Sequence, residues 1–171
     1  MSTIRKLGSG QPCPTDKGPG AVPMSMRVLV VEDFAPFRQF VTSTLGKTPD
    51  LQVIGEVSDG LEAVQKAQEL KPDLILLDIG LPTLNGIDAA RQIRKLSPES
   101  MIIFVSQESS ADVVHEALSL GASAYVLKAR AAIELLPVLN AIIFEKQSAH
   151  DTAGAASSAS RLNSVTEHDT V

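Results

Sequence analysis

Apolar positions between residues 26 and 147 follow two alternating patterns. Short runs of aliphatic residues recur, and each is followed by about ten residues with apolar side chains at helical spacing. Short apolar runs of this kind are typical of strands that are buried on both faces. The runs predict five strands, at 27–31, 52–57, 74–77, 101–105 and 124–127. The stretches after them predict helices at 35–45, 61–70, 87–96, 111–120 and 133–146.

This alternation predicts an α/β domain whose parallel sheet is covered by helices on both faces. Pro137 falls early in the last predicted helix, where a first turn tolerates proline. That helix is apolar around more than one face, whereas a helix on one side of a sheet needs a single apolar stripe. The additional apolar side chains indicate a surface that binds a partner. The two hypotheses for this partner are a second copy of the chain, forming a homodimer, and a docked output domain. The apolar residues are Leu135, Leu136, Val138, Leu139, Ile142, Ile143 and Phe144.

The two ends of the chain lack this periodicity. Residues 1–25 are rich in Gly, Pro and Ser, and we expect a disordered leader there. Residues 148–171 are mostly small and polar, and they indicate a flexible tail. The folded domain is therefore predicted to span residues 26–147.

Composition narrows the classes of partner. The formal net charge of −5 argues against a general nucleic-acid-binding surface. The single cysteine, Cys13, excludes an intramolecular disulfide and suits a reducing compartment. No apolar run approaches the roughly 18 residues that span a bilayer, and the N-terminus lacks the apolar stretch of a secretory signal. We therefore expect a cytoplasmic protein with no membrane partner and no direct contact with nucleic acid.

Polar side chains follow four of the predicted strands. Glu32 and Asp33 come after the first strand, and Asp78 comes after the third. Ser106 and Lys128 follow the fourth and fifth. Because functional groups of open parallel sheets gather outside the carboxyl ends of the strands, we expect these side chains to meet at one edge.

Three carboxylates at one edge would repel one another. At 4 Å each pair costs about 4 kcal/mol at an effective dielectric of 20, so a proton or a cation must relieve the repulsion. An all-oxygen set without His or Cys favours Mg²⁺ or Mn²⁺, and Mg²⁺ commonly shares its site with phosphate oxygens. Ser106 and Lys128 supply the hydroxyl and the positive charge that a phosphoryl group needs. Asp78 could then be a nucleophile that forms an aspartyl phosphate.

Each of these residues also has a simpler interpretation when it is taken alone. Asp33 can cap the first helix and so serve two roles. Ser106 can be a turn residue, Lys128 a solvated surface charge, and Tyr125 a packed core residue. Asn85 and the glycine after it read as a turn. Only the convergence of strand ends favours the chemical interpretation.

Four segments, VVEDF, LILLDIGLPTLNG, FVSQ and GASAYVLK, resemble the receiver domain of bacterial response regulators. They occur in the family's order across about residues 26–147, and their details are most similar to receivers of helix-turn-helix transcriptional regulators. The resemblance implies a flavodoxin-like (βα)5 fold with strand order 2-1-3-4-5. It also implies a part in two-component signalling or a phosphorelay.

The resemblance implies roles at the acidic edge. Asp78 would accept a phosphoryl group from the phosphohistidine of a histidine kinase or a phosphotransfer protein. Glu32, Asp33, Asp78 and the backbone carbonyl of Gly80 would hold Mg²⁺. Glu32 departs from the family pattern, in which Asp is commoner at the first acidic position.

The resemblance also implies a switch. Ser106 would turn toward the phosphoryl group, Lys128 would pair with it, and Tyr125 would change rotamer. The face made by the fourth helix, the fifth strand and the fifth helix would then change its packing and control a protein partner. Gln107 stands where the family often has a small residue, which predicts narrower access and slower phosphorylation by small donors.

The leading hypothesis is therefore a single-domain receiver that is phosphorylated and is not a turnover enzyme. Two alternatives are a receiver fragment of a DNA-binding regulator and a receiver that docks or dimerises without phosphorylation. Phosphohydrolases of the haloacid-dehalogenase type place a second Asp two residues after the nucleophile, where this chain has Gly80. A nucleotide- or flavin-binding module would want a Gly-rich first loop, whereas the loop here reads EDFAP.

Overall fold

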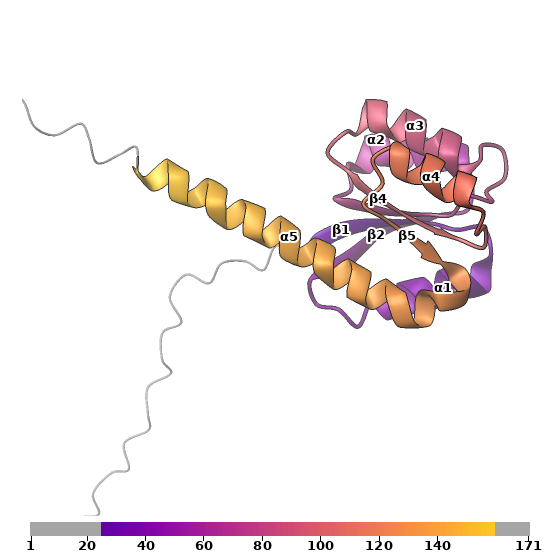
Figure 1. Ribbon diagram of the computed structural model, residues 1–171, viewed down its shortest axis with the longest axis horizontal. Helices are drawn as coiled ribbons and strands as arrows, with labels where there is room; N and C mark the ends of the chain where they lie inside the picture. Colours follow the sequence, from indigo (N-terminus) through magenta and orange to yellow (C-terminus); the bar gives the residue numbers. More distant parts are fainter. Residues whose placement is uncertain (1–24, 160–171) are drawn as a thin grey trace, which may run out of the picture.

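A five-stranded parallel sheet forms the centre of the molecule (Figure 1). The computed structural model describes residues 25–159 and the side chains of residues 25–148. The strand order is β2-β1-β3-β4-β5, and every neighbouring pair is parallel, which confirms the predicted flavodoxin-like order. The strands are β1 (Met26–Val31), β2 (Leu51–Val57), β3 (Leu74–Leu77), β4 (Met101–Ser106) and β5 (Ala124–Leu127).

Helices cover both faces of the sheet, as predicted. Figure 1 shows α1 and α5 on one face, and α2, α3 and α4 on the other. A short 3-10 helix, η1, joins β5 to α5 and was not predicted. The helices are α1 (Ala35–Leu45), α2 (Gly60–Leu70), α3 (Gly86–Leu96), α4 (Ala111–Ser119), η1 (Lys128–Arg130) and α5 (Ala131–Ala159).

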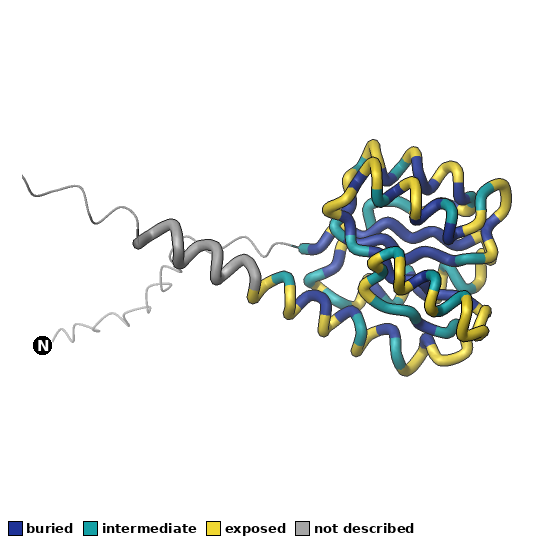
Figure 2. Tube along the Cα trace, turned by 45° about the horizontal axis from the view of Figure 1, so that its top comes forward, coloured by how far each residue is buried: buried dark blue, intermediate teal, exposed yellow. Residues whose placement is uncertain are grey.

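The sheet separates two aliphatic cores. Side chains alternate along a strand, so in β1 Val28 and Val30 pack toward α1 and α5, while Leu29 and Val31 pack toward α2 and α3. All four residues of β3 are buried, and Figure 2 shows the central strands in the colour of buried residues. This double coverage explains why β3 reads as an unbroken apolar run.

The cap of α1 differs from one prediction. Phe34, not Asp33, is the N-cap residue, and no side chain caps this helix. Pro36, in the first turn, has no N–H to be capped. The Asp33 carboxylate instead lies with those of Glu32 and Asp78. Asn85, which was expected to form a turn, is the N-cap residue of α3. Its side chain accepts a hydrogen bond from the Asp88 N–H at 2.9 Å.

The last helix is longer than predicted. We expected it to end at Lys146 and residues 148–171 to form a flexible tail, but α5 continues to Ala159. Alanine favours helix, and extending an existing helix costs less than starting a new one. The rest of the expected tail and the expected leader, apart from residue 25, lie outside the described residues. No helix among the described residues is both long and apolar enough to cross a bilayer.

Pro137 lies inside α5, not in its first turn, because the helix begins at Ala131. A proline removes the hydrogen bond to the carbonyl four residues earlier, which belongs to Ile133. Both residues are exposed, so water can reach that carbonyl. The solvent side of the helix therefore tolerates the proline.

Gly86 allows α3 to begin directly against the backbone of Asp78. A Cβ at Gly86 would overlap the carbonyl oxygen of Asp78. We expect Gly86→Ala to lower the free energy of unfolding by about 1–3 kcal/mol, because the backbone must move to make room. Urea denaturation followed by circular dichroism measures this change.

Gly46→Ala is the control for that substitution. Gly46 has a φ of −62°, and an added Cβ would lie 3.4 Å from its nearest neighbour. Its effect should stay within about 0.5 kcal/mol. Equal losses of stability at the two glycines would contradict the steric argument.

Candidate functional site

The three predicted carboxylates meet at the carboxyl edge of the sheet. Glu32 and Asp33 follow β1, and Asp78 follows β3, its neighbour in the sheet. Each residue offers an oxygen within 4.8 Å of the others. Glu32 and Asp78 are buried, whereas Asp33 is exposed. The cluster therefore opens to solvent on the side of Asp33.

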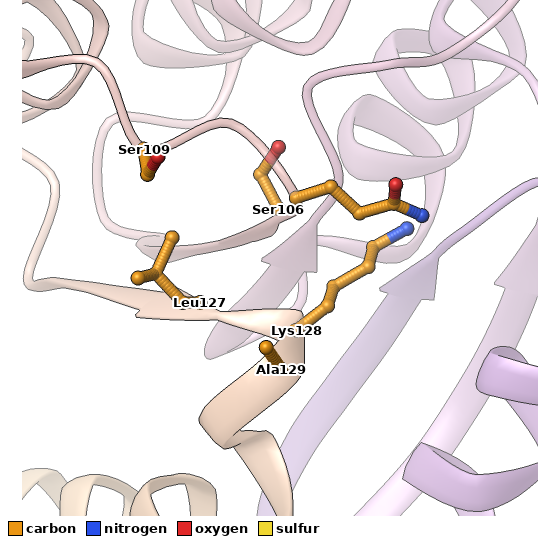
Figure 3. A pocket seen from close by; sticks show the side chains of 6 residues that line it. Ser106, Ser109, Leu127, Lys128 and Ala129 are labelled. Carbon is orange, nitrogen blue, oxygen red and sulfur yellow. The ribbon is translucent and has the colours of Figure 1, made fainter.

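Lys128 reaches two of these carboxylates. Its Nζ donates to Oε1 of Glu32 and to Oδ2 of Asp78, each at 2.8 Å. Figure 3 shows its side chain extending from the end of β5 toward the neighbouring strand ends. The ammonium also lies 5.1 Å from the ring centroid of Phe37, at a distance typical of a cation–π contact. Only 8% of the lysine side chain is exposed, so the simpler interpretation as a solvated charge is wrong.

The charges of this cluster do not balance. Three carboxylates face one bonded ammonium, which leaves about two negative charges uncompensated among them. Burial raises the pKa of the Glu32 carboxyl and the Asp78 carboxylate raises it further, while the hydrogen bond from Lys128 partly offsets both. Burial alone would lower the pKa of Lys128, but its bonds to Asp78 and Glu32 outweigh burial and raise it. The lysine is therefore charged at neutral pH.

The donor set suits a hard divalent cation. It contains carboxylate oxygens without His or Cys, and such oxygens are the ligands that Mg²⁺ prefers. Oδ1 of Asp78 accepts a hydrogen bond from the Ile79 N–H at 2.7 Å, and Oδ2 accepts one from Lys128. Each carboxylate oxygen has a second lone pair, so these bonds leave ligand capacity. The charge of Mg²⁺ also matches the uncompensated charge of the cluster.

A hollow of about 490 Å³ gives access to Asp78. Gly80 lines this hollow, and a Cβ on it would lie 3.8 Å from Oδ2 of Asp78, so a larger residue would narrow the entry. Gln107 lines the hollow as well, and the narrower access expected from it stays a prediction. The other lining residues are Asp33, Phe34, Ile79, Ser106, Glu108, Val113 and Lys128.

Ser106 and Tyr125 both form hydrogen bonds with Glu108, a residue that the sequence did not single out. Oγ of Ser106, at the buried end of β4, accepts a hydrogen bond from the Glu108 N–H at 3.2 Å. The Tyr125 hydroxyl donates to the Glu108 carbonyl at 2.7 Å, and burial raises the pKa of this tyrosine. The Glu108 carboxylate accepts from the N–H groups of Ser109 and Ser110, just before α4. Glu108 thus connects the site to α4.

Two residues of α1 were also missed. The helical period marks Phe37 as a core position, and it is half-buried, yet its ring also faces the ammonium of Lys128. Arg38 reads as a surface charge, but its Nη1 donates to the carbonyl of Glu32 at 2.6 Å. The one sequence feature that hinted at the contact of Arg38 was Pro36, because a proline removes a backbone N–H donor from this turn.

Comparison with known proteins identifies related chains. A protein-family model described as the response regulator receiver domain matches residues 28–140, which include the acidic cluster, Ser106 and Lys128. The chain is 44% identical over 111 residues to a protein-glutamate methylesterase/protein-glutamine glutaminase of Thermotoga maritima, covering 64% of this chain and 32% of that protein. It is 37% identical over 119 residues to the chemotaxis protein CheY of the same organism, and this match covers 70% of this chain and 98% of CheY.

The chain therefore spans about a third of the length of the first relative and nearly all of the second. Among solved structures, it resembles the response regulator domain of Thermotoga maritima CheB, with a TM-score of 0.64 and 38% identity. That superposition covers 70% of this chain and 96% of the solved domain.

Proposed function

Because the chain belongs to the response regulator receiver family, we propose that it is a signalling module switched by a phosphoryl group on Asp78. The observation that carries this proposal is the convergence of Asp78, two further carboxylates and Lys128 at one hollow of the sheet edge. Asp78 is the only one of the three carboxylates at the end of the central strand β3, and it is backed by the Ile79 N–H.

In the proposed reaction, a carboxylate oxygen of Asp78 attacks phosphorus. The new O–P bond replaces the P–N bond of a phosphohistidine on a histidine kinase or phosphotransfer protein, and the imidazole leaves with the electron pair and takes up a proton. Lys128 stays beside the acceptor and balances negative charge on the phosphoryl oxygens. Ser106 offers a hydroxyl from the end of the next strand.

Mg²⁺ would be held by Glu32, Asp33, Asp78 and the carbonyl of Gly80, and it would supply charge neutralisation for the phosphoryl oxygens. Mn²⁺ is an alternative ion with the same ligand preference. The burial and hydrogen bonds of Glu32 and Asp78 support this proposal, because they hold two of the proposed ligands in place.

The signal would leave through α4, β5 and α5. If Ser106 turns toward a phosphoryl group, it gives up its bond from the Glu108 N–H, and the segment whose carbonyl accepts from Tyr125 loses that contact with β4. Apolar side chains of the two helices are available to a partner, namely Leu118 on α4 with Ile133 and Leu136 on α5. A downstream protein or a second copy of the chain is the proposed partner.

Labelling with a small phosphodonor tests the proposal. The wild-type chain, incubated with acetyl phosphate and Mg²⁺, should gain one phosphoryl group by intact mass, and EDTA should prevent this gain. Tyr125 is the single tyrosine and the chain has no tryptophan, so tyrosine fluorescence reports this residue alone. Its emission should change with beryllofluoride and Mg²⁺ together. A chain that takes up no phosphoryl group in Mg²⁺ would contradict the proposal.

Gln107→Ala should speed phosphorylation by acetyl phosphate, because the glutamine lines the entry to Asp78. A barrier lower by up to about 1.4 kcal/mol corresponds to an increase of up to tenfold in rate. The initial rate of the mass gain at fixed Mg²⁺ measures this effect. Ser119→Ala, on the exposed end of α4, is the control and should keep the wild-type rate. An unchanged rate for Gln107→Ala would remove the access argument.

A further inference from the structure

Arg38 joins the turn after β1 to strand β2. Its Nη1 donates to the carbonyl of Glu32 at 2.6 Å and reaches the carbonyl of Asp33 at 3.5 Å. Its Nε lies 3.6 Å from Oε2 of Glu56 on β2. The arginine side chain is 24% exposed, so it is mostly covered by the chain around it. One guanidinium therefore contacts the backbone of both acidic residues that follow β1.

These two carbonyls lie before the N-cap of α1, so no helical N–H donates to them. Phe34 is the N-cap residue, so the helical ladder begins at its carbonyl, which accepts hydrogen bonds from the N–H groups of Phe37 and Arg38 at 3.0 Å each. The carbonyls of Glu32 and Asp33 precede this ladder, and Pro36 in the first turn has no N–H that could donate to either of them. The Arg38 guanidinium therefore donates to two carbonyls that the N–H groups of α1 do not reach.

We infer that Arg38 is a positioning residue for the divalent-cation site. By holding the carbonyls of Glu32 and Asp33, it fixes the peptide groups from which both carboxylates extend toward Asp78. Without this contact the turn must become ordered each time a cation binds, and that ordering reduces affinity. Groups that orient metal ligands in this way commonly contribute 10–100-fold to metal affinity. The inference rests on the proposed function, because it requires the cluster to bind Mg²⁺.

The sign of the effect separates positioning from simple electrostatics. A guanidinium is cationic, so as a charge alone it repels Mg²⁺ from the cluster. Removing it would then tighten Mg²⁺ binding. A positioning role requires the opposite result, in which binding weakens although a positive charge has been removed.

Titration with Mg²⁺ alone, by isothermal calorimetry at fixed ionic strength, tests this inference on the full chain. Arg38→Met keeps much of the aliphatic stem and should weaken Mg²⁺ binding about tenfold or more. Arg38→Lys keeps the charge but loses the fork of donors, so its affinity should be intermediate.

Arg94→Met is the matched control. Arg94 also bridges two backbone carbonyls, those of Ser100 and Gly121, but these precede β4 and β5 at the opposite edge of the sheet. Its loss should cost comparable stability and leave the affinity for Mg²⁺ unchanged. Urea unfolding of each variant shows that the titrated chains are folded.

Unchanged or tighter Mg²⁺ binding by folded Arg38→Met would overturn the inference and leave the proposed function intact. Equal weakening by Arg94→Met would also overturn it, because general destabilisation would then be the cause. If the wild-type chain binds no Mg²⁺, the metal of the proposed function fails, and the inference fails with it. If Arg38→Met does not fold, Arg38→Lys decides: weaker binding than wild type supports the inference, and wild-type affinity overturns it.

Discussion

Lys128→Met is expected to lower the free energy of unfolding by about 3–5 kcal/mol at neutral pH. The lysine is the cation that bonds the buried carboxylates of Glu32 and Asp78, and removing one partner of a buried ion pair leaves uncompensated charge. Methionine is close to lysine in length, so the lost free energy of unfolding reports the removed ammonium charge more than a change in side-chain volume. Urea denaturation without divalent ions measures it.

The loss should shrink as the pH falls. The pKa of Glu32 already lies above its ordinary value of 4.5, first because of burial and also because of Asp78, despite Lys128. A carboxyl whose pKa is raised by folding contributes stability below its unfolded pKa, and this contribution disappears as the pH rises through the folded pKa. Without Lys128 that folded pKa rises further. The difference in unfolding free energy between wild type and Lys128→Met should therefore be largest at neutral pH and smallest near pH 4.5.

Lys66→Met is the control for this prediction. Lys66 pairs with Glu69 at 2.8 Å on the exposed face of α2, and solvent screening makes the contribution of such surface pairs to stability small. Mg²⁺ should restore part of the stability of Lys128→Met, because it neutralises the same carboxylates, and should change Lys66→Met no more than wild type. Equal small losses in the two variants would show that the buried pair does not hold the site together.

Asp78→Asn should abolish labelling by acetyl phosphate. The carboxamide has no anionic oxygen to attack phosphorus, although its carbonyl oxygen can still accept the hydrogen bond from Lys128, so the fold should persist. The mass gain in Mg²⁺ should fall below detection. Asp88→Asn, an exposed aspartate in the first turn of α3, is the matched control and should label as wild type does. Full labelling of Asp78→Asn would place the nucleophile elsewhere.

The strands and most helix bounds follow from local patterns. The unbroken apolar run of β3 and the helical period of α1 each determine an element by themselves, and both match the predicted ranges. The end of α5 could not be predicted in this way, because small polar residues suit a tail and an extended helix alike. The prediction that Pro137 lies in the first turn of this helix was wrong for a related reason. Whether a helix tolerates a proline in its interior depends on which side of the helix faces solvent, and the local pattern does not show this.

The candidate site was only partly predictable. Strand order brings Asp78 beside Glu32 and Asp33, so their proximity follows once a parallel sheet is assumed. The contacts made by Arg38 and Glu108 do not follow, because they depend on side-chain directions and on backbone groups left without helical partners. Sequence patterns report burial well, but they do not report which carbonyl lacks a donor.

Locating the phosphoryl group within the chain tests the central claim most directly. The wild-type chain, phosphorylated by acetyl phosphate in Mg²⁺, can be reduced with borohydride, which converts an aspartyl phosphate to homoserine, and then digested for peptide mass spectrometry. The proposed function predicts conversion at Asp78 alone, dependent on Mg²⁺. A phosphoryl group on any other residue, or unmodified Asp78 in a chain that carries the label, would contradict it.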